Sequence, residues 1–195
     1  MEQQQIGFAF TGSFCTYARA LEALEETAQR YARVTPIVSE RGGATDTRFG
    51  SAGGFVAEME RICGRPVIDS IVKAEPIGPK KLLDALVICP CTGNTLAKLA
   101  AGIADSAVTM AAKSHLRNGR PLVLAVSTND GLAGAAKNIG ALLDKKHVYF
   151  VPFGQDDPAG KPCSLVADFR QVPETVAAAL RGEQLQPILL REERG

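Results

Sequence analysis

Two patterns in the sequence predict an α/β fold. Short, wholly apolar segments alternate along the chain with segments of helical periodicity, which is typical of strand–helix–strand units. Most of the apolar segments lack a polar alternation, as expected of parallel strands buried on both faces. At 195 residues the chain has the length of one domain. We therefore expect a single-domain Rossmann-like three-layer sandwich with a mostly parallel sheet, spanning residues 1–195.

The expected elements follow one another without an internal repeat or a dividing linker. The helix predicted to begin at Ser106 should stop at Asn118-Gly119, a usual helix end. The segment 67–72 is assigned as a strand, with a helix as its alternative. The strands are predicted at 6–10, 34–38, 67–72, 85–89, 122–126 and 147–151; the helices at 16–31, 55–63, from 95, 106–117, 131–143 and 172–180; the turns and loops at 41–54, 76–79 and 152–163.

Composition excludes several classes of function. The 22 Lys and Arg nearly balance the 21 Asp and Glu, so the charge does not favour nucleic acid or an anionic membrane. Residues 1–5 lack a basic signal-peptide start, and no apolar segment reaches the length of a membrane span. The five Cys lack paired spacing, and the two His lie far apart, so we expect buried thiols in a reducing cytoplasm and no metal site.

Ligands of parallel sheets bind beyond the carboxyl ends of the strands, so these ends are the candidate site. The first is Thr11-Gly12-Ser13, where free backbone N–H groups and a helix N-terminus could bind a phosphate. The alternative is a plain helix cap by Ser13 or Thr16. The tripeptide is not GxGxxG, so a dinucleotide fingerprint is absent and a mononucleotide phosphate is the ligand to consider.

Two further strand ends carry similar polar residues. Thr92-Gly93-Asn94-Thr95 combines a close backbone approach at Gly93 with an amide and hydroxyls that could bind the edge of a heteroaromatic ring. Its alternative is again a cap, by Asn94 or Thr95. Ser127-Thr128-Asn129 follows the next strand with the same residue types, so we expect both groups to converge on one crevice. Ser39 ends the second strand.

Ionisable side chains offer a few further candidates. Arg48, in a polar loop, could bind a substrate carboxylate through its bidentate guanidinium, or be an ordinary surface residue. Lys98 is a second candidate, although its helix could turn it away. Asp105 is expected to cap the following helix, and His115 to lie on a solvated cationic helix face.

These residues resemble a known family, the homo-oligomeric flavin-containing Cys decarboxylases. The family motif is Pro-Ala-Ser-Ala-Asn-Thr followed by Gly-Ile-Ala-Asp, and this chain has Pro90-Cys91-Thr92-Gly93-Asn94-Thr95 and then Gly102-Ile103-Ala104-Asp105. The resemblance implies FMN, with its phosphate near Gly12, Ser13 and Ser39, the motif Asn at Asn94, and assembly as a trimer or dodecamer. The family's catalytic His is missing from residues 75–80, and its Pro-x-Met-Asn clamp is replaced by Val126–Asn129, which argues against decarboxylation of a cysteinyl substrate.

Long segments such as "AEPIGPKKLLDALVICPCTGNTLAKLA" and "RNGRPLVLAVSTNDGLAG" resemble one branch of this family, found in spore-forming bacteria. The likeness runs from about residue 6 to residue 187. It implies a protein that works with a separate NADP-binding partner to oxidise a small dihydropyridine dicarboxylate in the sporulating mother cell. Three alternatives stay open: an FMN-binding catalytic component, a non-catalytic component that supports the NADP-binding partner, and a free-standing FMN-dependent decarboxylase-like enzyme.

Overall fold

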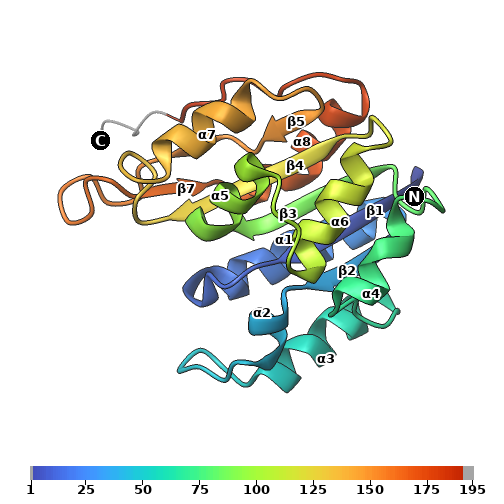
Figure 1. Cartoon of the computed structure of the whole chain (residues 1–195). Coiled ribbons are helices and arrows are strands. Elements are labelled where there is room, and N and C mark those ends of the chain that lie inside the picture. Colours follow the sequence, from blue (N-terminus) through green and yellow to red (C-terminus); the bar gives the residue numbers. More distant parts are fainter. Residues whose placement is uncertain (1, 191–195) are drawn as a thin grey trace.

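The fold is built around one sheet, described by a computed structural model for residues 2 to 190 (Figure 1). Within those residues the sheet has seven strands in the order β2-β1-β3-β4-β7-β6, and β5 also pairs with β4. The strands are β1 (Glu2–Phe10), β2 (Tyr31–Val38), β3 (Ala85–Cys91), β4 (Leu122–Thr128), β5 (Val148–Phe150), β6 (Phe153–Gly154) and β7 (Leu165–Ala167). The predicted α/β fold with a mostly parallel sheet is confirmed; residues 1 and 191–195 of the predicted domain lie outside the described part.

The central strands are parallel and buried on both faces. All seven residues of β3 are buried, and β4 is buried up to Ser127. β1 lies between β2 and β3 and pairs in parallel with both. The chain therefore leaves β1 toward one side to form β2 and crosses to the other side to form β3. The strand order reverses at this point, between β1 and β3, where α/β sheets open a crevice for ligands.

Helices form the outer layers. α1 (Tyr17–Arg30) and α8 (Val172–Leu180) contact each other and cover one face of the sheet, whereas α5 (Gly93–Ala101), α6 (Ala107–Leu116) and α7 (Ala136–Leu143) cover the other (Figure 1). α3 (Ala52–Cys63) lies against β2 and α1, preceded by the short α2 (Glu40–Ala44). In α1 the buried residues Ala20, Ala23, Leu24 and Thr27 recur at helical spacing, which produces the inward face.

The predicted strand at 67–72 is wrong. Ile68 forms only an isolated bridge with Ile37 of β2, and the chain then enters the short helix α4 (Ile71–Ala74). Asp69 and Ser70 interrupt the apolar run, and the Ser70 side chain accepts a hydrogen bond from the backbone N–H of Lys73. A side chain that caps a helix start thus overrides the β propensity of the flanking residues.

The end of the sheet also differs from the prediction. The segment 152–163, predicted as a polar loop, begins with β6, and β7 follows it as an antiparallel strand. β7 also pairs antiparallel with Ser127 and Thr128 of β4. The helix predicted at 131–143 begins only at Ala136, because Gly131 and Gly134 place turns before it.

Candidate functional site

The carboxyl ends of β1 and β3 are joined by side-chain hydrogen bonds. The Thr11 hydroxyl donates to the carbonyl of Pro90 at 2.7 Å and accepts from the backbone N–H of Thr92 at 3.2 Å. Thr11 is itself buried, so this pair of bonds is shielded from water. The first and third strand ends are thereby fixed next to each other, at the point where the strand order reverses.

The end of β4 is connected to the same rim. The Ser13 and Ser127 hydroxyls lie 2.9 Å apart and share a hydrogen bond across 114 residues of sequence. The Thr128 hydroxyl donates to Asp130, and both side chains face Gly93: a Cβ at Gly93 would lie 2.7 Å from Thr128 Oγ1 and 2.8 Å from Asp130 Oδ1. The three strand ends therefore lie close together. However, Ser13, Gly93, Ser127 and Thr128, which were predicted to bind the cofactor, do not line the crevice described next.

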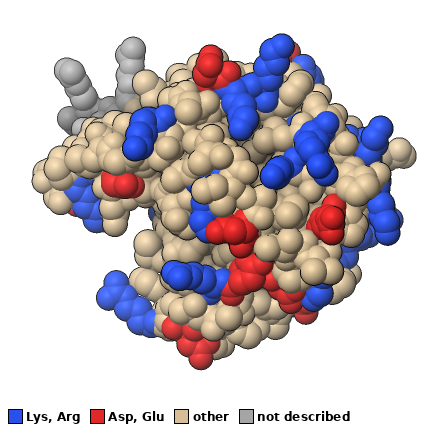
Figure 2. Space-filling model, viewed as in Figure 1, with Lys and Arg blue, Asp and Glu red and all other residues tan. Residues whose placement is uncertain are grey.

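A crevice of about 850 Å³ opens along this rim. The space-filling view is hollowed on the side where these strands end, and both signs of charge are interspersed over the visible face (Figure 2). The crevice is the candidate site, and its size falls within the range of about 300–1,000 Å³ usual for small-molecule pockets. It is lined by Thr11, Gly12, Phe14, Ser39, Glu40, Arg41, Thr45, Thr92, Asn94, Thr95, Lys98, Asp105 and Ser106.

Four charged side chains line the crevice, and three of them have partners. The Lys98 ammonium donates to both carboxylate oxygens of Asp105 at 2.8 and 2.9 Å, and this contact lowers the pKa of Asp105. The Glu40 carboxylate accepts from the backbone N–H of Ala107 at 3.0 Å, at the start of α6. Arg41 has no ion pair among the described residues, so its guanidinium is available to an anion.

Several predicted site residues line the crevice and others do not. Gly12, Ser39, Thr92, Asn94, Thr95 and Lys98 belong to its wall. The Asn94 side chain is exposed and has no hydrogen-bond partner within the described chain. Asn129 is exposed and lies outside the wall, and so does Arg48, whose guanidinium lies over the Phe49 ring at 4.8 Å. The sequence reasoning missed Arg41 and Glu40, although both directly follow the second strand end.

The helix caps around the crevice differ from those that the sequence suggested. Neither Ser13 nor Thr16 makes a side-chain cap bond. Thr92 caps α5, which leaves Asn94 in the first turn with its side chain uncommitted. Ser106 caps α6 through a reciprocal pair of bonds with Thr109, so the expected cap by Asp105 is wrong. Because neither side chain caps a helix, Ser13 can bond to Ser127 and the Asn94 side chain stays available to a ligand.

Other expectations concern residues outside the crevice. His115 is buried and does not lie on a solvated face; its Nε2 is 2.9 Å from the Pro121 carbonyl oxygen. Cys89 and Cys91 are buried free thiols whose pKa values are raised by burial. No group of three metal-ligating side chains occurs within residues 2–190. None of the helices in that range has the length and apolar character needed to cross a membrane.

The donor set of the crevice fits a mononucleotide. Hydroxyls, the start of α5 and the available Arg41 guanidinium suit a phosphate and a polar ring edge. Fold and site thus define an α/β protein with a mononucleotide-sized crevice at the switch point of its sheet.

Comparison with known proteins identifies the family. A family model described as Flavoprotein matches residues 1–152, and the chain belongs to that family. The B subunit of dipicolinate synthase from Bacillus subtilis (strain 168) is 47% identical over 195 residues, which cover 100% of this chain and 98% of the relative. The resemblance expected from the sequence motifs is therefore confirmed.

Solved structures show the same relationship. The crystal structure of the dipicolinate synthase B subunit from Bacillus halodurans C matches with a TM-score of 0.90 and 47% identity, covering 97% of each chain. The dodecameric FMN-dependent UbiX-like decarboxylase from Escherichia coli O157:H7 matches with a TM-score of 0.61 and 22% identity, covering 76% of this chain and 79% of the other. At that identity the second likeness concerns the fold alone.

Proposed function

We propose that this chain is the B subunit of a dipicolinate synthase, which binds FMN in the crevice and acts with the NADP-binding A subunit of the same enzyme. The observation that carries the proposal is the crevice at the β1–β3 switch point, whose wall holds Asn94 and Arg41 with side chains free of partners in the described chain. The full-length similarity to the B subunit of dipicolinate synthase supports the choice of reaction.

The residues on the wall have distinct tasks in this proposal. Gly12, Ser39 and the Arg41 guanidinium bind the phosphate of FMN, because they combine close backbone approach, a hydroxyl and a positive charge. Asn94 and the Thr92 and Thr95 hydroxyls bind the polar edge of the ring. Arg48, on the neighbouring exposed loop, is the candidate for a substrate carboxylate.

The reaction needs little from the protein beyond binding and orientation. Oxidation of dihydrodipicolinate removes a hydride and a proton, and the ring becomes aromatic. FMN held by the crevice residues would supply the hydride acceptor, with oxidised NADP on the A subunit as the final acceptor of the same two electrons. The chain's own residues then hold the dicarboxylate beside the acceptor.

We further propose that the chain assembles with copies of itself, as a trimer or dodecamer, and works in the cytoplasm of the sporulating mother cell. The dodecameric relative supports an assembly of this kind. Light scattering of the purified chain should then give a mass several times that of one 20.6 kDa chain. A monomer at micromolar concentration contradicts this part of the proposal.

The experiment that tests the proposal is a titration of the chain with FMN, followed through flavin fluorescence and absorbance between 300 and 500 nm. Asn94→Ala should weaken FMN binding by about tenfold, the cost of one lost hydrogen bond. Asn138→Ala is the matched control, since Asn138 lies in α7, away from the crevice wall. The control should bind FMN like the unaltered chain.

The two halves of the proposal fail separately. A chain that does not bind added FMN contradicts the flavin assignment. If the complex with the A subunit oxidises dihydrodipicolinate equally well with Asn94→Ala at FMN concentrations too low to saturate the variant, the crevice has no catalytic role and the chain is a structural partner of that protein. Turnover of dihydrodipicolinate by this chain alone points instead to a free-standing enzyme.

A further inference from the structure

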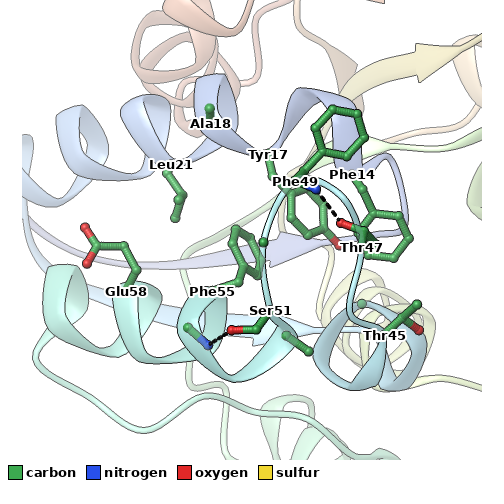
Figure 3. Close-up of a pocket in the computed structure, with 14 residues that line it drawn as sticks. Phe14, Tyr17, Ala18, Leu21, Thr45, Thr47, Phe49, Ser51, Phe55 and Glu58 are labelled. Atoms are coloured by element: carbon green, nitrogen blue, oxygen red, sulfur yellow. Dashed lines mark hydrogen bonds between the residues drawn. The ribbon is translucent and has the colours of Figure 1, made fainter.

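A second pocket, separate from the proposed flavin crevice, lies between α1 and α3 (Figure 3). Its volume is about 290 Å³, near the lower end of the range usual for small-molecule sites. It shares Phe14 and Thr45 with the crevice, so the two sites are neighbours with a common wall. The rings of Phe14, Tyr17, Phe49 and Phe55 gather around it.

The aromatic rings of this pocket pack against one another and form an apolar wall. Tyr17 stacks on Phe55 with centroids 4.1 Å apart and an interplanar angle of 18°. Phe14 lies against Tyr17 at 5.1 Å in a tilted arrangement. Phe49 lines the pocket while 54% of its surface is exposed to solvent. A planar ring that entered would gain stacked or edge contacts with several of these residues.

The Tyr17 hydroxyl gives the pocket its polar specificity. Tyr17 is only 8% exposed, and its hydroxyl has no hydrogen-bond partner among residues 2–190. The oxygen lies beside Gly42 on the pocket wall, where a Cβ would come within 2.9 Å of it. Burial raises the pKa of Tyr17, so the group stays a donor. A buried donor without an acceptor is costly, and a ligand that supplies the acceptor removes this cost.

Charge distinguishes this pocket from the crevice. Glu58 is the one charged side chain among its lining residues, all of which lie in the described part of the chain. The Glu58 carboxylate accepts two bonds from Arg61, at 2.9 and 2.7 Å. The lining of the pocket therefore includes neither Lys nor Arg. Arg48 lies over the Phe49 ring, but it is not one of the lining residues.

A ligand can reach the hydroxyl if the segment 46–50 moves outward. Its hydrogen bonds stay within residues 46 to 52: Thr47 and Gly50 exchange backbone bonds of 3.0 and 3.1 Å, and Ala52 N–H donates to the Asp46 carboxylate at 2.8 Å. The segment can therefore shift as a unit without losing bonds to the sheet or to α1.

We propose that this pocket binds a small, uncharged, planar six-membered ring with one hydrogen-bond acceptor, which accepts a bond from the Tyr17 hydroxyl. The site goes beyond the flavin crevice and does not depend on it. The exposed Phe49 ring and Phe55 provide the contact area, the Tyr17 hydroxyl fixes the orientation of the ring, and the absence of Lys and Arg from the lining disfavours carboxylates.

The test uses benzamide as the neutral probe and benzoate as its anionic counterpart, with binding to the full chain measured by ligand-observed NMR. Benzamide should bind and benzoate should bind at least about tenfold more weakly. Tyr17→Phe should weaken benzamide binding about two- to tenfold, the usual effect of one hydrogen bond. The same variant should melt no lower than the parent without ligand, because it removes an unpaired buried hydroxyl.

A second pair of variants separates pocket occupancy from folding. Ala18→Leu fills the pocket from an exposed helix position and should abolish benzamide binding, whereas Ala57→Leu, exposed on α3 and outside the pocket, should not change it. FMN and benzamide should bind together. Undiminished binding to Tyr17→Phe or Ala18→Leu, equal binding of benzoate, or displacement of benzamide by FMN would overturn the assignment.

Discussion

His115 is a titratable residue in the core, where only one of its two ring nitrogens has a hydrogen-bond partner within the described chain. It is fully buried in α6, and its Nε2–H donates to the Pro121 carbonyl, which leaves Nδ1 without a partner within the described chain. A second proton would therefore place an unpaired N–H in the core. Burial is the main reason that the pKa of His115 falls from 6.5 to about 4; the nearby Arg120 also lowers it, while the Pro121 carbonyl and Asp84 oppose the shift.

Because the pKa of His115 is lowered in the folded chain, we expect the protein to lose stability in mild acid. Because the unfolded chain binds the proton more readily than the folded chain, the unfolding free energy should decrease as the pH falls from about 6.5 toward 4, by at most about 3 kcal/mol. The full stability is present above a pH of about 6.5. Urea unfolding at pH 7.5 and pH 5 measures the difference.

His115→Gln should flatten this pH dependence, because the amide can keep a bond to Pro121 without titrating. His147→Gln is the control, since His147 is exposed and should leave the slope unchanged. An equal pH slope in His115→Gln and the parent would contradict the assignment to His115.

At the scale of the element, the start of α5 is the most constrained part of the site. Gly93 is the first residue of that helix, and its Cα faces the hydrogen-bonded pair of Thr128 and Asp130. The helix can therefore approach the end of β4 only if this position carries no side chain. That approach brings Asn94 to the crevice wall.

Gly93→Ala should destabilise the protein by about 1–3 kcal/mol, as overpacking of a tight contact does. Gly140→Ala is a sharp control, because Gly140 lies in α7 and a Cβ added there would meet nothing within 4 Å. There the same change should stabilise the protein by about 0.5–1 kcal/mol. Thermal unfolding of both variants distinguishes them, and equal melting temperatures would contradict the packing argument.

The predictions from sequence succeeded where local pattern decides the structure. The apolar run predicts β3 at 85–89, and the strand extends to Cys91, which pairs with Val126 of β4. β7 was missed because three residues are too short to show a periodic pattern. The hydrogen bond between Ser13 and Ser127 and the burial of the Tyr17 hydroxyl depend on tertiary packing. They cannot be predicted from the residues next to them in the sequence.

At the scale of the whole molecule, the crevice links elements from both halves of the chain. Its wall includes residues after β1, β2 and β3, so a ligand bound there should stabilise the entire fold. With FMN at about 100 times its dissociation constant, we expect about 2.7 kcal/mol of added stability. For a domain of this size that is a rise in Tm of roughly 5–10 °C.

Differential scanning fluorimetry with increasing FMN measures this shift, with riboflavin as the comparison ligand that lacks the phosphate. Riboflavin should give a smaller shift if Arg41 and the Gly12 turn bind the phosphate. Equal shifts from both ligands would contradict a phosphate subsite, and no shift from either would contradict flavin binding.

The antiparallel pairing of β7 with the end of β4 has a consequence for how this protein tolerates change. Ser127 pairs with Val166 of β7 and also holds the hydroxyl of Ser13. The antiparallel pair of β6 and β7 therefore helps, through Ser127, to hold the turn that follows β1 in place. Insertions or deletions between residues 155 and 164, although far along the chain from residue 13, should therefore alter the position of the turn after β1 and, with it, the affinity of the proposed FMN site.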